Sequence, residues 1–210
     1  MDSGQIATVM SHLKAIATWY WNSDTPTAVF LEDDMILSTC QYWTFKWDDI
    51  IERLNKHQWN CIQLSLIRAD DAMVPLNDDD IQFRRRSFYN WSAGSYMITR
   101  EYAKVLLDHY VPVDGELNLS IYGYPEYFPY IENVLYVAGR PHEYTLPLFV
   151  ENTQYTSTFY KHFPTGMVGK HKQGQVYSSA FIHNWWKENG HRVNIDELMT
   201  FKETWYWDKG

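Results

Sequence analysis

Cysteines, basic runs and long apolar stretches are scarce in this sequence of 210 residues, and each shortage excludes a class of protein. The two cysteines, Cys40 and Cys61, give neither a disulfide framework nor the spacing of a zinc site, so we interpret them as buried free thiols of a reducing compartment. No apolar run approaches the length that a membrane-spanning helix needs. These absences predict a soluble, cytoplasmic protein without a membrane span.

Positive charge is also in short supply, because the formal net charge is -8 and the one basic run, Arg84 to Arg86, is short. A protein of this charge repels a phosphate backbone, which excludes nonspecific nucleic-acid binding. Aromatic residues are abundant instead and make up 17% of the chain, with 10 Trp and 16 Tyr. Aromatic rings stack on the apolar faces of sugars and also fill cores, so this surplus is compatible with a carbohydrate ligand without requiring one.

Helical and strand-like patterns alternate along the chain, which is typical of an α/β sheet with crossover helices. The length fits one domain, which we divide into a core over residues 1–160 and a C-terminal loop and helical extension, residues 161–210, packed on that core. The first predicted elements are a helix within Met1–Thr18, a strand over Ala28–Leu31, a surface helix over Trp47–Lys56 and a strand over Cys61–Leu66.

The second half of the chain continues the alternation with more irregular connections. Thr99 is placed to cap a helix over Arg100–Tyr110. The other predicted elements are a short helix over Leu117–Tyr122, a strand over Asn133–Val137, a loop or lid over Phe159–Gln175, and helices over Ser179–Asn189 and Asn194–Trp205.

An acidic tip follows the predicted strand Ala28–Leu31, where Glu32, Asp33 and Asp34 stand in succession before a second apolar run. Burying three unpaired carboxylates is prohibitive, so the strand must open here into water or into a cation site. Carboxylate oxygens suit a hard divalent cation, which in turn binds phosphate oxygens. Because strand side chains alternate, Asp34 and Glu32 are expected on one side and Asp33 on the other. A solvated acidic turn is the alternative interpretation.

Small residues lead into another predicted strand within Trp91–Thr99, and Ser92 and Gly94 let a backbone or a ligand approach closely. Beyond the helix that follows, a turn presents two carboxylates, Asp114 and Glu116. A capped turn between the helix and the next strand is one interpretation of these two carboxylates.

Five segments follow one another along the chain: Gly4–Leu13, which contains Ser11-His12; Leu31–Met35; Ser92–Leu107; Pro112–Asp114; and Pro147–Leu148 with the cluster Thr156–Thr158. Together they resemble the glycosyltransferase family 25 proteins, which include bacterial lipooligosaccharide galactosyltransferases and procollagen galactosyltransferases. The first segment is similar to the family's Gly-Glu-Ile-Gly-Cys-x-x-Ser-His stretch, with Gln5 for Glu and without the Cys. Family members normally carry several strands before this segment, so the resemblance implies an N-terminally shortened fold.

The resemblance implies a Rossmann-like GT-A fold, with a mixed sheet flanked by helices, and transfer of a hexose, often galactose, from a UDP-sugar to a glycan or protein acceptor. The implied cofactor is Mn²⁺ or Mg²⁺, a Lewis acid for the leaving diphosphate. The implied metal ligands are Glu32, Asp34 and His162, with His171 as the next choice for the third. The implied donor-binding residues are Ser11, His12, Glu32, Asp33, Ser92 and Gly94, and the catalytic base is Asp114, then Glu116. Ser11 and His12 are expected either to support the acidic tip from the neighbouring helix or to touch the donor.

Two other functions stay open. A catalytically impaired transferase fold that binds carbohydrate or assists assembly is favoured by the aromatic surplus and by the missing strands. A metal-dependent phosphodiester hydrolase would use the acidic clusters, although the sequence has no His/Asp spacing typical of hydrolases. A homo-oligomer formed through an incomplete sheet edge is a further expectation.

Overall fold

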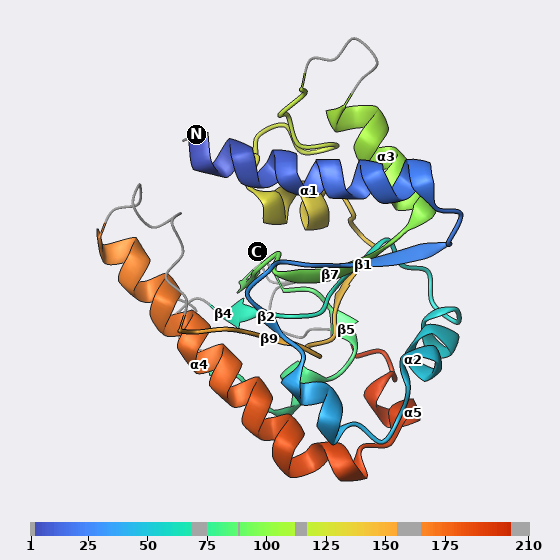
Figure 1. Cartoon of the computed structure of the whole chain (residues 1–210), viewed down its shortest axis with the longest axis vertical. Helices are drawn as coiled ribbons and strands as arrows, with labels where there is room; N and C mark the ends of the chain where they lie inside the picture. Colours follow the sequence, from blue (N-terminus) through green and yellow to red (C-terminus); the bar gives the residue numbers. More distant parts are fainter. Residues whose placement is uncertain (1–2, 69–74, 88, 112–116, 155–164, 203–210) are drawn as a thin grey trace.

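A mixed five-stranded sheet crosses the protein, and helices cover both of its faces (Figure 1). The computed structural model describes residues 3–68, 75–87, 89–111, 117–154 and 165–202. Across the sheet the strands are β1 (Thr27–Leu31), β7 (Ser95–Thr99), β3 (Cys61–Gln63), β8 (Glu143–Thr145) and β5 (Arg84–Arg85). The predicted α/β class, with a mixed sheet flanked by helices, is confirmed.

Strand β7 organises this sheet, because it runs antiparallel to both β1 and β3, whereas β3 and β8 run parallel. Four of its five residues are buried, as expected for a strand that has neighbours on both sides and helices over both faces of the sheet. Strand β1 pairs with β7 along its whole length and is an edge strand within the described part of the chain. Its last residue, Leu31, lies opposite Ser95, so β1 ends beside the small residues that precede β7.

Helices α1 (Ser3–Asn22) and α3 (Arg100–Tyr110) cover the upper face of the sheet in Figure 1. The side chain of Thr99 accepts a hydrogen bond from the backbone N–H of Tyr102, which caps α3 as predicted. A π-helical segment, η4 (Asn133–Val137), joins the same layer. The buried side chains of this layer include Val9, Leu13 and Ile16 of α1, Leu106 and Tyr110 of α3, and Val134 and Leu135 of η4.

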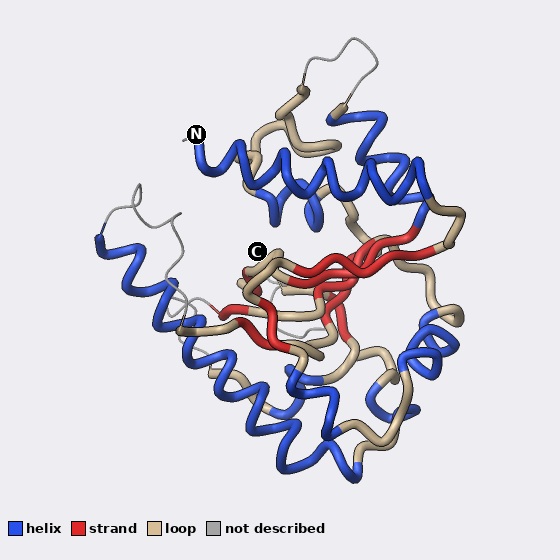
Figure 2. The backbone as a smooth tube through the Cα atoms, viewed as in Figure 1, coloured by secondary structure: helices blue, strands red, loops and turns tan. Residues whose placement is uncertain are grey.

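The opposite face is covered by α4 (Thr165–Asn189), α2 (Trp47–Leu54) and α5 (Ile195–Leu198), and Figure 2 shows the two helical layers in blue on either side of the red strands. Trp186 of α4 is fully buried and donates its Nε1–H to the carbonyl of Pro147 over 2.9 Å. The remaining elements are the 3-10 helices η1 (Ser38–Tyr42), η3 (Asp78–Ile81) and η6 (Gly190–Arg192), and two ribbons, β2 (Met35–Ile36) with β9 (Val150–Glu151) and β4 (Ile67–Arg68) with β6 (Asn90–Trp91). Among the described helices, none combines the length and apolar character that crossing a bilayer requires.

Four predicted elements differ from the structure. The helix predicted over 194–205 is helical only over Ile195–Leu198; residues 199–202 are not helical, and 203–205 lie outside the described residues. Residues 133–137 form a π-helix instead of a strand, because a short buried apolar run has the same pattern in either conformation. Residues 117–122 form no helix. The loop predicted over 159–175 is helical from residue 165 onward, and 159–164 lie outside the described residues. Gly174 suggested a loop but serves close packing, since a Cβ there would lie 2.6 Å from the backbone oxygen of Arg68.

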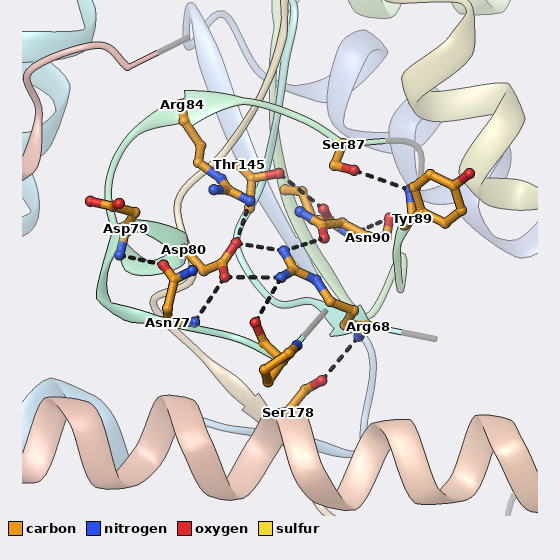
Figure 3. Close-up of polar contacts among 12 residues, drawn as sticks. Arg68, Asn77, Asp79, Asp80, Arg84, Ser87, Tyr89, Asn90, Thr145 and Ser178 are labelled. Carbon is orange, nitrogen blue, oxygen red and sulfur yellow. Dashed lines mark hydrogen bonds and ion pairs between the residues drawn. The ribbon is translucent and has the colours of Figure 1, made fainter. Parts of the chain in front are cut away.

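One buried carboxylate, Asp80, joins η3 to strands β4 and β5 (Figure 3). Its side chain is 1% exposed, accepts hydrogen bonds from both terminal nitrogens of Arg68 and forms an ion pair with Arg84. The backbone N–H of Asn77 donates to Oδ2 of Asp80 over 2.9 Å, and Arg68 also reaches Oδ1 of Asn90 over 3.2 Å. We call these five residues the Asp80 cluster, in which two guanidinium groups neutralise one carboxylate.

Candidate functional site

The three consecutive acids lie in a turn that follows β1. The ladder between β1 and β7 extends one residue further, because the backbone N–H of Glu32 donates to the carbonyl of Gly94 over 2.8 Å. The N–H of Met35 then donates back to the carbonyl of Glu32 over 3.2 Å, which closes the turn. Strand alternation therefore does not extend to these acids. Asp33 points into solvent, whereas Glu32 and Asp34 are half-buried.

The carboxylate of Glu32 is held from α1 by His12. Nε2 of His12 lies 2.9 Å from Oε1 of Glu32, and Nδ1 lies 2.9 Å from the hydroxyl of Tyr96 on β7. Burial, and then the nearby Cys61 and Glu32, raise the pKa of Tyr96 well above its usual value, so the phenol keeps its proton. Both ring nitrogens of His12 are therefore engaged, Nδ1 with the phenol of Tyr96 and Nε2 with the carboxylate of Glu32. This relay of hydrogen bonds fixes the position of Glu32.

Asp34 is the least satisfied acid of the turn. Its Oδ1 atom is buried and has no hydrogen-bond partner, although the backbone carbonyl of Asp34 accepts from the N–H of Asn152 over 2.8 Å. Burial raises the pKa of its carboxyl group, and the negative charges of Glu32 and Asp33 raise it further. Its own backbone N–H and the charge of Lys172 act in the opposite direction. A bound cation would satisfy Oδ1 and offset this repulsion.

Ser92 is a buried residue that lies between the acidic turn and β9. Its backbone has a φ of 91°, a left-handed conformation that is rare for residues other than glycine and is found mainly where the surroundings enforce it. The carbonyl of Ser92 accepts from Nε2 of Gln63 over 2.9 Å and from the hydroxyl of Tyr136 over 3.0 Å. Its hydroxyl donates to Oε1 of Glu151 and accepts from the N–H of Gly94. Hydrogen bonds to Gln63, Tyr136, Glu151 and Gly94 therefore fix Ser92 in this conformation.

Glu151, at the end of β9, is the most deeply buried of these acids, with 9% of its surface exposed. The pairing of β2 with β9 places it opposite Met35, directly after the acidic turn. Burial raises the pKa of Glu151 to about 7, and the charges of Asp34 and Glu32 add to the increase, against the hydrogen bonds from Ser92 and Gln175. Near pH 7 this carboxyl group is therefore partly protonated and partly ionised.

A fourth acid, Glu132, approaches from the start of η4. Burial raises its pKa, and the charge of Glu32 adds to this effect, while its own backbone N–H, the charge of Arg86 and the backbone N–H of Ser92 lower it. We call Glu32, Asp34, Glu132 and Glu151, gathered around Ser92, the acidic site.

Helix α4 contacts the acidic site at Glu151. Nε2 of Gln175 donates to Oε2 of Glu151 over 2.9 Å, and Nζ of Lys172 donates to Oε1 of Gln175 over 3.0 Å. The neighbouring His171 stacks on Trp91, with ring centroids 5.9 Å apart. Burial, and then Lys172, lower the pKa of His171, which favours its neutral form.

The structure brings together five of the predicted site residues, His12, Glu32, Asp34, Ser92 and Gly94. Ser11 is exposed, and its hydroxyl bonds to the carbonyl of Ala7 one turn earlier, away from the acids. Asp33 is exposed as well. Asp114, Glu116 and His162 lie outside the described residues.

Sequence reasoning missed Glu132, Glu151, Lys172 and Gln175. The one available signal was the position of Glu151 close behind Pro147-Leu148, which resembles a family 25 motif. Within the residues that the structure describes, no three His, Cys, Asp or Glu side chains are arranged to hold a metal ion.

Comparisons with protein-family models, with curated proteins and with solved structures find no match to this chain.

Proposed function

We propose that the protein is a metal-dependent glycosyltransferase with a GT-A fold, which transfers a hexose, with galactose as the first candidate, from a UDP-sugar to a glycan or protein acceptor. The observation that carries this proposal is the acidic turn after β1, where Asp34 has a buried Oδ1 without a partner beside the oriented carboxylate of Glu32. The order of the family 25 motifs along the chain supports the same activity.

The oxygen ligands of the acidic site fit a hard divalent cation. Asp34 offers an unsatisfied carboxylate oxygen, and mutual repulsion between Asp34 and Glu32 would fall when a cation binds. We assign Asp34 and Glu32 as ligands, and His162 stays the first candidate for a third. When bound, the cation supplies Lewis-acid stabilisation of the negative charge on a leaving diphosphate.

The chain's own residues would accept the proton of the acceptor hydroxyl and hold the carboxylates of the site in position. The hydroxyl of the acceptor attacks the anomeric carbon, the bond from that carbon to the diphosphate oxygen breaks, and its electron pair stays on the phosphate. The proton of the attacking hydroxyl passes to a base, for which Asp114 stays the first candidate and Glu116 the second. His12 holds the carboxylate of Glu32 in position, and the hydroxyl of Ser92 holds that of Glu151.

The proposal is tested by Mn²⁺ titration calorimetry and by hydrolysis or transfer of UDP-galactose. Asp34→Asn removes one carboxylate charge with little change in shape, and we expect Mn²⁺ affinity to fall by about tenfold or more and turnover to be lost. Asp24→Asn, on the exposed loop before β1, is the matched control and should behave as wild type. Wild-type protein that binds neither Mn²⁺ nor UDP would contradict the proposal.

A carbohydrate-binding function without catalysis is the second candidate. It is favoured by Phe128 and Tyr130, which are 69% and 39% exposed with ring centroids 6.0 Å apart, a suitable pair for stacking on a sugar ring. Binding of glycans that is unchanged by EDTA and by Asp34→Asn would select this function.

A further inference from the structure

Strand β1 is the outermost strand on its side of the five-stranded sheet within the described residues. Two backbone hydrogen bonds beyond its ends show which of its residues face β7. The N–H of Arg100 donates to the carbonyl of Pro26, and the N–H of Glu32 donates to the carbonyl of Gly94, each over 2.8 Å. Hydrogen-bonded pairs alternate along an antiparallel ladder, so the even-numbered residues between these two bonds face β7.

The odd-numbered residues of β1 are Thr27, Val29 and Leu31, and their N–H and C=O groups point away from the sheet. No described residue donates to these groups or accepts from them. A row of unpaired backbone groups is a template on which another extended chain can add a strand. Edge strands commonly carry a charged residue, a proline or a bulge that prevents such pairing, and β1 has none of these.

The side chains of β1 add apolar surface to this edge. Phe30 packs on the side of α1, and its ring stacks on that of Tyr96 with centroids 5.2 Å apart. Because side chains alternate along a strand, Val29 and Leu31 face the other side of the sheet, where Met97 lies opposite Val29. Met97 is 1% exposed, whereas Val29 and Leu31 are 36% and 45% exposed. An added strand would cover the apolar side chains that β1 leaves at the edge.

The charge around β1 favours a basic partner over a second copy of this chain. Three acids follow the strand, and Asp33 among them is exposed. Residues 23–34, which a second copy would bring to this edge, contain acids but no lysine, arginine or histidine, so two copies would place like charges together. The net charge of -8 on each copy adds repulsion at longer range. A strand that ends in lysine or arginine would instead place a cation beside Asp33.

We propose that the edge of β1 binds an extended, basic segment of another protein, which joins the sheet as an additional strand. The segment carries apolar or β-branched side chains that cover Val29 and Leu31, and a lysine or arginine at the end that meets Asp33. Backbone hydrogen bonds to β1 provide affinity, and these side chains provide selectivity. The proposal does not depend on glycosyltransferase activity, because these three side chains lie outside the acidic site.

The first test is amide hydrogen exchange, followed by NMR on the full chain. The probe is a short peptide of alternating valine and threonine with lysines at both ends. It should slow exchange of the Val29 and Leu31 amides by about tenfold or more, because these N–H groups gain acceptors. The amides of Ala28 and Phe30 already face β7 and should change much less. Peptide binding that leaves Val29 and Leu31 unchanged would place the peptide elsewhere and overturn the proposal.

Matched peptides separate backbone pairing from charge, and calorimetry on the wild-type protein measures both. Methylation of the central backbone nitrogens of the peptide removes their N–H groups, so affinity should fall by about tenfold or more. Replacement of the terminal lysines by glutamates should also lower affinity by about tenfold at low salt, and by less at high salt. A glutamate peptide that binds as tightly as the lysine peptide would overturn the choice of a basic partner.

Variants of the protein test the same edge from the other side. Val29→Pro removes an N–H that faces outward, which an edge strand tolerates, and should weaken lysine-peptide binding by about tenfold with little change in melting temperature. Val29→Ala keeps the N–H and should weaken binding less. Asp33→Asn should weaken binding by about threefold. The control is Glu52→Gln on α2, which removes an acid that is 71% exposed and should have no effect.

Three results would overturn the proposal. Wild-type protein that binds none of these peptides has no strand-binding edge. Peptide binding that is insensitive both to backbone methylation and to Val29→Pro does not use the edge of β1. A wild-type dimer in analytical ultracentrifugation that Val29→Pro dissociates would assign the edge to a second copy of this chain.

Discussion

The Asp80 cluster and the acidic site both bury carboxylates, but they treat the charge in opposite ways. Asp80 is 1% exposed and has two guanidinium groups, from Arg68 and Arg84, against its single charge. Glu151 is 9% exposed, and its two oxygens accept from the neutral groups of Ser92 and Gln175, while other acids stand nearby. The charge of Asp80 is neutralised by arginines of the fold, whereas Glu151 has no cation among these hydrogen-bond partners.

This difference separates a structural cluster from a functional one. Removing one partner of a buried ion pair lowers the free energy of unfolding. The Asp80 cluster therefore holds η3, β4 and β5 together. Like charges held together lower stability, and such an arrangement is typical of sites that bind a cation. Substitutions in the Asp80 cluster should therefore lower the stability of the fold. Substitutions that remove a charge from the acidic site should lower the repulsion between its carboxylates.

The largest effect is expected for Asp80→Asn. Two buried guanidinium groups would lose their counter-charge, so the free energy of unfolding in urea should fall by about 3 to 5 kcal/mol. The matched control is the neighbouring Asp79→Asn, because Asp79 is 68% exposed and its pair with Lys202 lies on the surface. That control should cost less than about 1 kcal/mol. Equal effects of the two substitutions would contradict the contrast.

The next effect is a pH dependence that arises from Glu151. Its pKa is raised from 4.5 to about 7 in the folded protein, so between these values the folded state binds more protons than the unfolded state. Stability contributed by this group is therefore present below pH 4.5 and is lost as the pH rises to about 7. The loss is about 3 kcal/mol.

Denaturation of wild type and Glu151→Gln at a series of pH values measures this contribution as a difference. The stability of wild type relative to the variant should decline as the pH rises through this window, because only wild type carries the titrating carboxyl group. Glu52→Gln, on the exposed side of α2, should show no such trend. A pH-independent difference for Glu151→Gln would show that the pKa of its carboxyl group is the same in the folded and the unfolded protein.

The smallest effect is expected for Asp34→Asn in the absence of metal. The substitution removes a charge that Glu32 and Asp33 repel, so thermal denaturation at neutral pH should show a gain in stability. The gain should stay below about 1 kcal/mol because water screens a half-exposed group. In the presence of Mn²⁺ the order should reverse, since only wild type gains the free energy of binding. A loss of stability without metal would show that Asp34 is part of the structural framework.

The sequence predicted the parts of the acidic site that depend on local pattern. The strand that ends in Glu32 to Asp34, the small residues Ser92 and Gly94 before β7, and the cap of α3 by Thr99 all follow from neighbouring residues. The support of Glu32 by His12 was one of the roles expected for the Ser11-His12 pair.

The remaining residues of the site depend on contacts that no local pattern encodes. Glu151 meets the acidic turn only because β9 pairs with β2, and Gln175 meets Glu151 only because α4 packs across the sheet. The glycines of 166–174 indicated a loop, whereas Gly174 allows α4 to approach the carbonyl of Arg68. The choice between a π-helix and a strand at 133–137 was likewise made by packing.

The topology of the sheet also sets the order in which the protein can assemble during translation. The central strand β7 joins β1 to β3 only after residues up to 99 have left the ribosome. The bond from the N–H of Arg68 to the hydroxyl of Ser178 spans 110 positions. Contacts of such range form slowly, because the intervening chain must lose its freedom first. The emerging chain therefore exposes Glu32 and Asp34 early and receives Lys172 late, so that the site acquires both signs of charge only when α4 docks.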